Sequence, residues 1–269
     1  MLIDVHAHFY TAVSGRWDWR ERDARRLEVG GRLGITAHIA SVLGTWGRLS
    51  PTYFPAPDHV TLGNAAMLEV QRAHPGLVFG YCTVNPNYGK HALEEIDRWL
   101  GEGMVGIKLA ASRRASDPLL DPIAEAAAKH GVPILHHVWQ HRRRDWPGQE
   151  ASDAAELAAL AVRHPRTKFI LAHIGGGGDW SHSLRVVRKT TNIWVDLSGS
   201  GVDVDMLHAV IGDVHPTRLV WGTDATMCTG WAKLRYLETA AGLAADRLEL
   251  IRSDNALELF RLEVGHAGH

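Results

Sequence analysis

Eight short apolar runs recur along the chain, and longer segments with the spacing of amphipathic helices lie between most of them. The apolar runs are Leu2–Val5, Ile35–Leu43, Leu77–Val84, Val105–Leu109, Val132–Leu135, Lys168–Ala172, Ile193–Leu197 and Arg218–Trp221. Such runs, bounded by Gly, Pro or polar residues, are typical of strands buried on both faces of a parallel sheet. The amphipathic segments are Ala65–Ala73, His91–Leu100, Pro118–Lys129, Asp153–Arg163, Trp180–Arg188 and Val204–Ile211. Eight strand–helix repeats in 269 residues predict an α/β fold, a (β/α)8 TIM barrel that forms a single domain over residues 1–269.

Two segments interrupt this rhythm, and each follows the C-terminal end of a predicted strand. Ser14–Gly34 is rich in Trp, Arg and Glu, and Gly44–Val60 is rich in Pro, Tyr and Phe. Because active sites of such barrels lie at the C-terminal ends of the strands, we expect both segments to be loop insertions that cover a substrate. The last segment, Asp246–Leu262, predicts a closing helix with Asp254 or Asn255 at an N-cap.

The composition excludes several classes of protein. The chain is 45% hydrophobic and 22% charged, with a formal net charge of −1, so we expect no nucleic-acid or membrane partner. No stretch reads as a signal peptide or a membrane span. With only Cys82 and Cys228 there is no disulfide framework, which favours the cytoplasm. The sequence leaves the oligomeric state open, and a homodimer is compatible with it.

Histidine is unusually frequent, with 17 residues, and two of them end the first predicted strand. Side chains alternate between the faces of a strand, so His6 and His8 point the same way, which in a closed barrel is inward. Two imidazoles in this arrangement can bind one cation. Taken alone, the pair is equally compatible with two histidines that are hydrogen-bonded to their neighbours at the end of a strand.

Polar side chains at other strand ends change that balance. His136 and His137 end the fifth strand, His173 the sixth and Asp224 the eighth, while Lys108 lies in the fourth. So many ionisable groups at one end of a barrel are costly to bury unless a cation or mutual hydrogen bonds compensate. A purely structural role therefore becomes the weaker interpretation.

The order and placement of these pieces resemble the amidohydrolase superfamily, in particular the amidohydrolase-2 branch that includes aminocarboxymuconate-semialdehyde decarboxylase. The matching pieces are Asp4-Val5-His6-Ala7-His8, Gly106-Ile107-Lys108-Leu109, Gly131-Val132-Pro133-Ile134-Leu135-His136-His137, Phe169-Ile170-Leu171-Ala172-His173-Ile174-Gly175-Gly176 and Val220-Trp221-Gly222-Thr223-Asp224. They span nearly the whole chain.

The resemblance implies a divalent metal ion, most simply Zn²⁺, with Mn²⁺ or another first-row ion as alternatives. Its ligands would be His6, His8, His137 and Asp224, with His137 chosen because it follows the family's Pro by four residues. His136 then points away from the centre, although a β-bulge would exchange the two.

The resemblance gives two further residues a role beside the metal. His173 is similar to a histidine that either binds a second ion or acts in catalysis, and Asp224 both contacts the metal and takes a proton from water. Lys108 occupies the position at which two-metal members carry a carbamylated bridging lysine. A free lysine there could instead bind a substrate carboxylate or pair with Asp224. The overall likeness favours one ion over two.

Such a site could lower the pKa of bound water to about 7. We therefore expect first a metal-dependent hydrolase acting on a small amide, ester or lactone. The alternative is a decarboxylase or hydratase, a lyase acting on a small unsaturated or aromatic carboxylic acid. A third possibility, a barrel that only binds a ligand or holds a structural metal, leaves Asp224 and His173 without a role.

Substrate contacts should come from the loops that follow the strands. The candidates are Arg113, Trp139, Arg142 and Trp180. An arginine there would suit a carboxylate, because its planar guanidinium can pair with both oxygens. Each candidate is also compatible with a solvated surface position.

Overall fold

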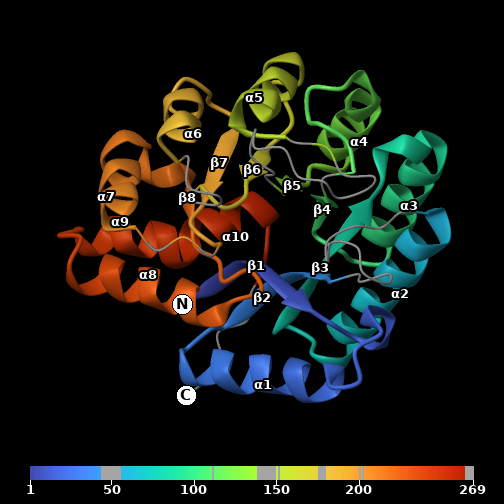
Figure 1. Ribbon diagram of the computed structural model, residues 1–269, viewed down its shortest axis with the longest axis horizontal. Coiled ribbons are helices and arrows are strands. Elements are labelled where there is room, and N and C mark those ends of the chain that lie inside the picture. Colours follow the sequence, from blue (N-terminus) through green and yellow to red (C-terminus); the bar gives the residue numbers. More distant parts are fainter. Residues whose placement is uncertain are drawn as a thin grey trace.

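The computed structural model describes residues 1–43, 56–110, 112–137, 150, 152–174, 180–199, 201 and 203–263. Eight parallel strands follow one another around a barrel in chain order, surrounded by the helices (Figure 1). The strands are β1 (Ile3–Phe9), β2 (Ala37–Val42), β3 (Val78–Val84), β4 (Gly106–Leu109), β5 (Ile134–His136), β6 (Phe169–Leu171), β7 (Ile193–Asp196) and β8 (Leu219–Val220). The prediction of a (β/α)8 barrel is confirmed.

Helices α1 to α8 form the outer ring, and the C-terminal elements close the chain (Figure 1). The helices are α1 (Trp19–Arg32), α2 (Pro57–Ala73), α3 (Gly89–Gly101), α4 (Asp121–His130), α5 (Ala154–Arg163), α6 (Trp180–Val187), α7 (Val204–Asp213), α8 (Met227–Thr239), α9 (Ala245–Glu249) and α10 (Asn255–Phe260). Short helical turns are η1 (Ala12–Ser14), η2 (Pro86–Tyr88), η3 (Pro118–Leu120), η5 (Pro216–Arg218) and the π-helical η6 (Leu250–Asp254). In the described part of the chain, no helix combines the length and apolarity that crossing a membrane requires.

The barrel closes where β8 meets β1. Trp221 accepts a hydrogen bond from the backbone of Val5 (3.0 Å), and Asp224 donates one to the carbonyl of His6 (2.6 Å). The pairing of β1 with β2 shifts register between Asp4 and Ala7, as a β-bulge does. The seam therefore brings the end of the chain's eighth strand directly against the two histidines of the first.

The barrel interior divides into an apolar half and a polar half. The apolar half includes Val5, Leu135, Ile170 and Val220, and each precedes a polar residue of the candidate site along the chain. Phe260 of α10 belongs to the same cluster, so the C-terminal helix packs against the apolar half of the barrel. This packing leaves the C-terminal ends of the strands for polar side chains.

The expected loop insertion at residues 14–34 is wrong for most of its length, because α1 occupies Trp19–Arg32. Ion pairs at i,i+4 spacing stabilise this helix on its solvent side, including Arg25 with Glu21 and Arg32 with Glu28. Gly30 is its only buried residue, and a Cβ there would lie 2.8 Å from Nε2 of His38. A helix that is polar almost all round has no apolar stripe for a pattern search to find.

Two other expectations need correction. In the second predicted insertion, residues 44–55 lie outside the described residues, and Pro57–Val60 belong to helix α2. Of the two expected N-cap residues, Asp254 holds the N-cap position of α10 but makes no side-chain cap hydrogen bond. The amide of Asn255 instead donates to the backbone carbonyls of Pro216 and Leu219, both at 2.7 Å, and so ties the C-terminal helices to β8. Helix α8, which the pattern did not predict, follows Asp224 directly.

Candidate metal centre

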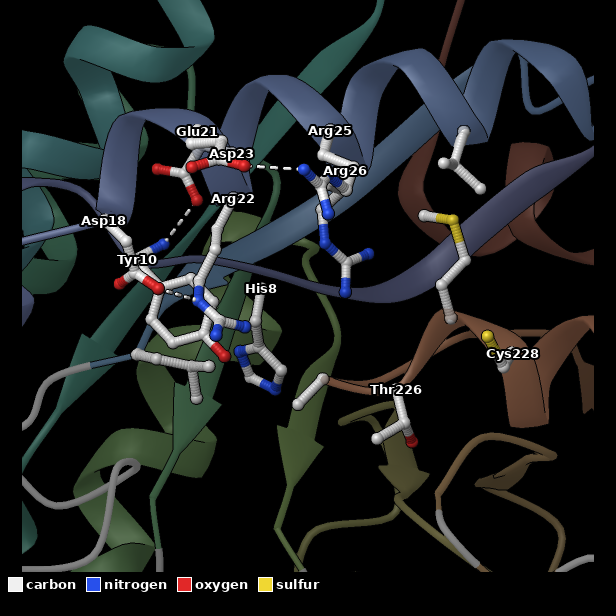
Figure 2. Close-up of a pocket in the computed structure, with 14 residues that line it drawn as sticks. His8, Tyr10, Asp18, Glu21, Arg22, Asp23, Arg25, Arg26, Thr226 and Cys228 are labelled. Carbon is white, nitrogen blue, oxygen red and sulfur yellow. Dashed lines mark hydrogen bonds and ion pairs between the residues drawn. The ribbon is translucent and has the colours of Figure 1, made fainter. Parts of the chain in front are cut away.

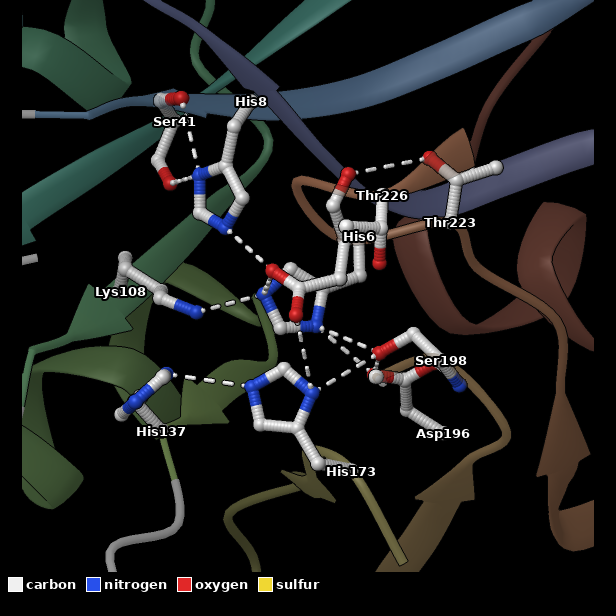
Figure 3. Close-up of polar contacts among 12 residues, drawn as sticks. His6, His8, Ser41, Lys108, His137, His173, Asp196, Ser198, Thr223 and Thr226 are labelled. Carbon is white, nitrogen blue, oxygen red and sulfur yellow. Dashed lines mark hydrogen bonds and ion pairs between the residues drawn. The ribbon is translucent and has the colours of Figure 1, made fainter. Parts of the chain in front are cut away.

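His6 and His8 lie together at the C-terminal end of β1, as their spacing predicts. Both are buried, and their ring centroids are 5.0 Å apart (Figure 3). Each ring is held through Nδ1: that of His6 lies 2.7 Å from Oδ2 of Asp196, and that of His8 lies 3.1 Å from Oγ of Ser41. A partner on one ring nitrogen fixes the tautomer and leaves the other nitrogen available to a metal.

Asp224 completes a group of three possible ligands with these histidines. Its Oδ1 lies 3.1 Å from Nε2 of His8 and 3.9 Å from Nε2 of His6. All three ligand atoms lie within 4.8 Å of one another. Among the described residues, the buried Nε2 of His8 has no hydrogen-bond partner, although it faces this carboxylate. Two imidazole nitrogens and one carboxylate oxygen fit a divalent first-row ion.

His173 and His137 lie beside this group. Nε2 of His173 is 3.2 Å from Nδ1 of His137, and Nδ1 of His173 is 3.5 Å from Oδ2 of Asp224. His137 is not part of the group of three. The structure therefore brings together three of the four predicted ligands, and the fourth, His137, contacts His173 instead. His136 contacts Oγ of Ser152 instead (2.8 Å).

The residues at the ends of β6 and β8 have unusual backbone geometry. His173 has φ of +56° and Asp224 has φ of +58°, backbone angles that residues other than glycine rarely adopt. Strained residues of this kind concentrate at functional sites, where the surrounding structure holds them. The backbone therefore supports a functional role for the same two residues that the sequence singles out.

Asp196 and Ser198 were not predicted, yet they connect the site. Oγ of Ser198 lies 3.1 Å from Nδ1 of His6 and 3.2 Å from Nδ1 of His173, and it donates to Asp196. His6, His173 and Asp196 form a second possible metal group. Because His6 and Asp196 already contact at 2.7 Å, that pair is better described as a hydrogen bond that orients the ring.

Lys108 of β4 points into the same centre (Figure 3). Its Nζ lies 2.9 Å from Nε2 of His6, and the side chain is buried. Burial lowers the pKa of this amine to about 8, although Asp224 and Asp196 act in the opposite direction. The lysine is therefore partly neutral near physiological pH.

The charges of the group suit metal binding. Burial lowers the pKa values of His6, His8, His137 and His173, which favours the neutral form of each ring. Burial alone would raise the pKa of Asp224, but the adjacent histidines, His173 first, hold it well below its usual range. Neutral imidazoles and an ionised carboxylate are the protonation states in which these side chains bind metals.

Two of the predicted substrate contacts are held by partners outside the metal group. Arg113 is paired with Glu150 (2.9 Å) and Asp117 (3.2 Å), and the indole of Trp180 donates to Asp203 (2.9 Å). Trp139 and Arg142 lie outside the described residues. The structure thus brings neither Arg113 nor Trp180 to the metal group.

A cavity of about 460 Å³ opens beside His8, between α1 and the start of α8 (Figure 2). Tyr10 and charged residues of α1 line one side, and Ala225–Cys228 line the other. No sequence pattern predicts this cavity, because the residues of α1 were expected to form a loop.

Comparisons with known proteins identify the family of this chain. The chain matches the amidohydrolase family model over residues 3–262 and therefore belongs to that family. Compared by sequence with curated proteins, it matches none.

Solved structures share the fold at low identity. A 5-carboxyvanillate decarboxylase from Sphingomonas paucimobilis has a TM-score of 0.72 at 18% identity, covering 97% of this chain and 99% of that chain. A dihydroxybenzoic acid decarboxylase from Polaromonas sp., with bound manganese and the inhibitor 2-nitroresorcinol, has a TM-score of 0.71 at 16% identity (97% and 96% covered). A 4-oxalomesaconate hydratase from Rhodopseudomonas palustris has a TM-score of 0.67 at 17% identity (97% and 96% covered).

Proposed function

We propose that this protein is a metal-dependent lyase that decarboxylates a small aromatic or unsaturated carboxylic acid. The observation that carries the proposal is the convergence of His6, His8 and Asp224 on one point at the barrel's C-terminal end. Hydrolysis, our first expectation from the sequence, uses the same residues. The likeness in fold to two decarboxylases and a hydratase favours the lyase alternative.

The ion would be held by His6, His8 and Asp224, with His137 as the fourth ligand after a small movement toward them. Imidazole and carboxylate ligands suit Zn²⁺ and Mn²⁺ alike, and one of the structural neighbours holds manganese. When bound, the ion polarises and positions a substrate oxygen. One ion per chain is the simplest occupancy for this ligand set.

We assign proton transfer to Asp224 and the stabilisation of negative charge to His173. In a decarboxylation, the bond to the carboxyl carbon breaks, carbon dioxide leaves, and the electron pair that remains on the substrate carbon takes up a proton. Asp224 is ionised, so it can accept a proton from water or a substrate hydroxyl and pass it to that carbon. Nδ1 of His173 lies 3.5 Å from Oδ2 of Asp224. His173 can therefore donate a hydrogen bond to a substrate oxygen that shares the negative charge of the reacting carbon.

Two measurements test this function. Purified protein, stripped with a chelator and reloaded with Zn²⁺ or Mn²⁺, should take up about one ion per chain and release carbon dioxide from hydroxybenzoate-type acids. His8→Ala should lose the ion. His173→Asn should keep the ion and lose about 10²–10⁴-fold in turnover. His130→Asn, a change at the outer end of α4, should match the parent protein.

Other outcomes would contradict the proposal. Cleavage of amides, esters or lactones without carbon dioxide release from any acid would select the hydrolase instead. Full activity of the metal-free protein would exclude metal dependence altogether.

A further inference from the structure

The proposed reaction assigns no role to the cavity beside His8. His8 lines it, so the cavity and the metal group share a side chain. Its volume, about 460 Å³, lies within the range of small-molecule sites. Val29, Leu43 and Met227 give it apolar walls, as a flat ring requires.

Arg22 reaches into this cavity from α1. Figure 2 shows its side chain directed from the helix toward His8 and Tyr10. The guanidinium lies 5.8 Å from the centroid of the Tyr10 ring, and Nε donates to Oδ2 of Asp18 (2.6 Å). Among the described residues, this is the only hydrogen bond that the guanidinium makes, so its two terminal nitrogens are available to a ligand.

Asp18 does not neutralise Arg22 on its own, because Arg16 shares it. Arg16 binds Asp18 with two nitrogens, at 2.8 and 3.0 Å. These two arginines and one carboxylate together carry a net charge of +1. The surplus charge lies at the wall of the cavity.

The other charged groups of the cavity wall have partners within the protein. Arg25 pairs with Glu21 (2.6 Å). Arg26 donates to Oγ1 of Thr223 (2.9 Å) and to the backbone carbonyl of Asp224. Asp23 accepts hydrogen bonds from the backbone N–H groups of Tyr10 and Thr11, at 2.8 and 2.9 Å. Both residues therefore hold the cavity in shape, and Arg22 is the better candidate to contact a ligand.

We infer that Arg22 binds a carboxylate of the substrate at the end remote from the metal. The inference rests on the proposed function and narrows the substrate class to dicarboxylic acids with a small flat core. One acidic group lies toward the metal group, the core lies against the apolar wall, and the second carboxylate pairs with the guanidinium. Arginine suits this task because its planar nitrogens match the two carboxylate oxygens.

The test compares two probes, benzoate and benzene-1,3-dicarboxylate, by calorimetric titration of the full chain with and without Mn²⁺. The parent protein should bind the dicarboxylate about fivefold to tenfold more tightly than benzoate, the gain expected for a partly exposed charge-assisted contact. Arg22→Gln should bring the ratio of the two affinities, dicarboxylate over benzoate, close to one. Arg22→Lys should restore part of the preference.

Arg32→Gln is the matched control. Arg32 lies on the same helix, forms an exposed i,i+4 pair with Glu28, and does not line the cavity, so its ratio should equal that of the parent. Thermal unfolding of each variant checks that the fold is intact. A parent without the preference, or an Arg22→Gln variant that keeps it, overturns the inference. A chain that takes up no metal but retains the Arg22-dependent preference overturns the proposed function alone.

Discussion

Nζ of Lys108 lies 2.9 Å from Nε2 of His6, the nitrogen that faces the candidate metal position. A lysine cation and a metal ion compete for the same lone pair, so the amine must be neutral or turned away when an ion binds. Burial brings the pKa of Lys108 to about 8, which makes the neutral form accessible. The protonation state of Lys108 therefore affects whether His6 is free to bind an ion.

Replacing Lys108 with methionine tests the single-ion arrangement. Because a free lysine only competes with the ion, Lys108→Met should still bind about one ion per chain, with affinity equal to or up to about tenfold above the parent. Metal analysis and competition with a chromophoric chelator measure both quantities. Two ions in the parent and fewer in the variant, with a carbamyl group on the lysine by mass spectrometry, would show a bridging role instead.

Asp196 should control metal affinity through His6. Its Oδ2 lies 2.7 Å from Nδ1 of His6, so the carboxylate orients the ring and fixes its tautomer. Loss of such a partner typically costs 10–100-fold in metal affinity, and we expect Asp196→Asn to fall within about that range. The measurement is the same chelator competition.

Ser41→Ala provides the comparison for that variant. Nδ1 of His8 contacts both Oγ of Ser41 (3.1 Å) and its backbone carbonyl (3.3 Å), so the carbonyl remains after the hydroxyl is removed. Its metal affinity should stay within about threefold of the parent. Equal effects of the two substitutions would argue against a specific orienting role for the carboxylate.

Gly222, two residues after β8, lies against His6 and Asp196. A Cβ at this position would come within 2.9 Å of both Oδ1 of Asp196 and Cβ of His6. Gly222→Ala should therefore displace the ring of His6, weaken metal binding and lower the free energy of unfolding by about 1–3 kcal/mol. In helix α7, a Cβ on Gly212 meets nothing within 4 Å, so Gly212→Ala should be neutral or stabilising by up to about 1 kcal/mol. Urea unfolding distinguishes them, and equal effects would contradict the steric argument.

The barrel and most of its polar strand ends could be predicted because buried parallel strands leave an apolar signal in the sequence. His6, His8, His173 and Asp224 follow such runs directly, and the structure brings them together. Helix α1 could not be recognised, because it presents charged pairs to solvent and buries little.

Asp196 could have been found by the same rule that selected Asp224, since it lies near the end of the predicted strand Ile193–Leu197 and is the last residue of β7. The role of Asp196 could not be predicted, because it depends on a contact with His6, 190 positions away in the sequence. The cavity depends in turn on where α1 packs. Contacts of this kind follow from tertiary packing and leave no local periodicity.

Lys233 is a buried cation outside the metal group. Its Nζ donates to the backbone carbonyls of Ser198 and Gly199, at 2.7 and 2.8 Å, and so holds the loop after β7 whose Ser198 contacts His6. Burial lowers the pKa of Lys233 from 10.5 to about 8, although Asp196 and Asp224 oppose the shift. The folded state therefore penalises the protonated lysine more than the unfolded state does.

This penalty predicts a pH-dependent stability. Between about pH 8 and 10.5 the unfolded chain binds more protons at Lys233 than the folded chain, so stability gained from this group rises with pH and is lost as pH falls through about 8. Urea unfolding of metal-free protein from about pH 7 to about pH 10 should show the parent gaining roughly 2 kcal/mol relative to Lys233→Met. Lys129→Met, at an exposed position of α4, should follow the parent at every pH. A difference between the parent and Lys233→Met that stays constant with pH would mean that this lysine keeps its ordinary pKa in the folded protein.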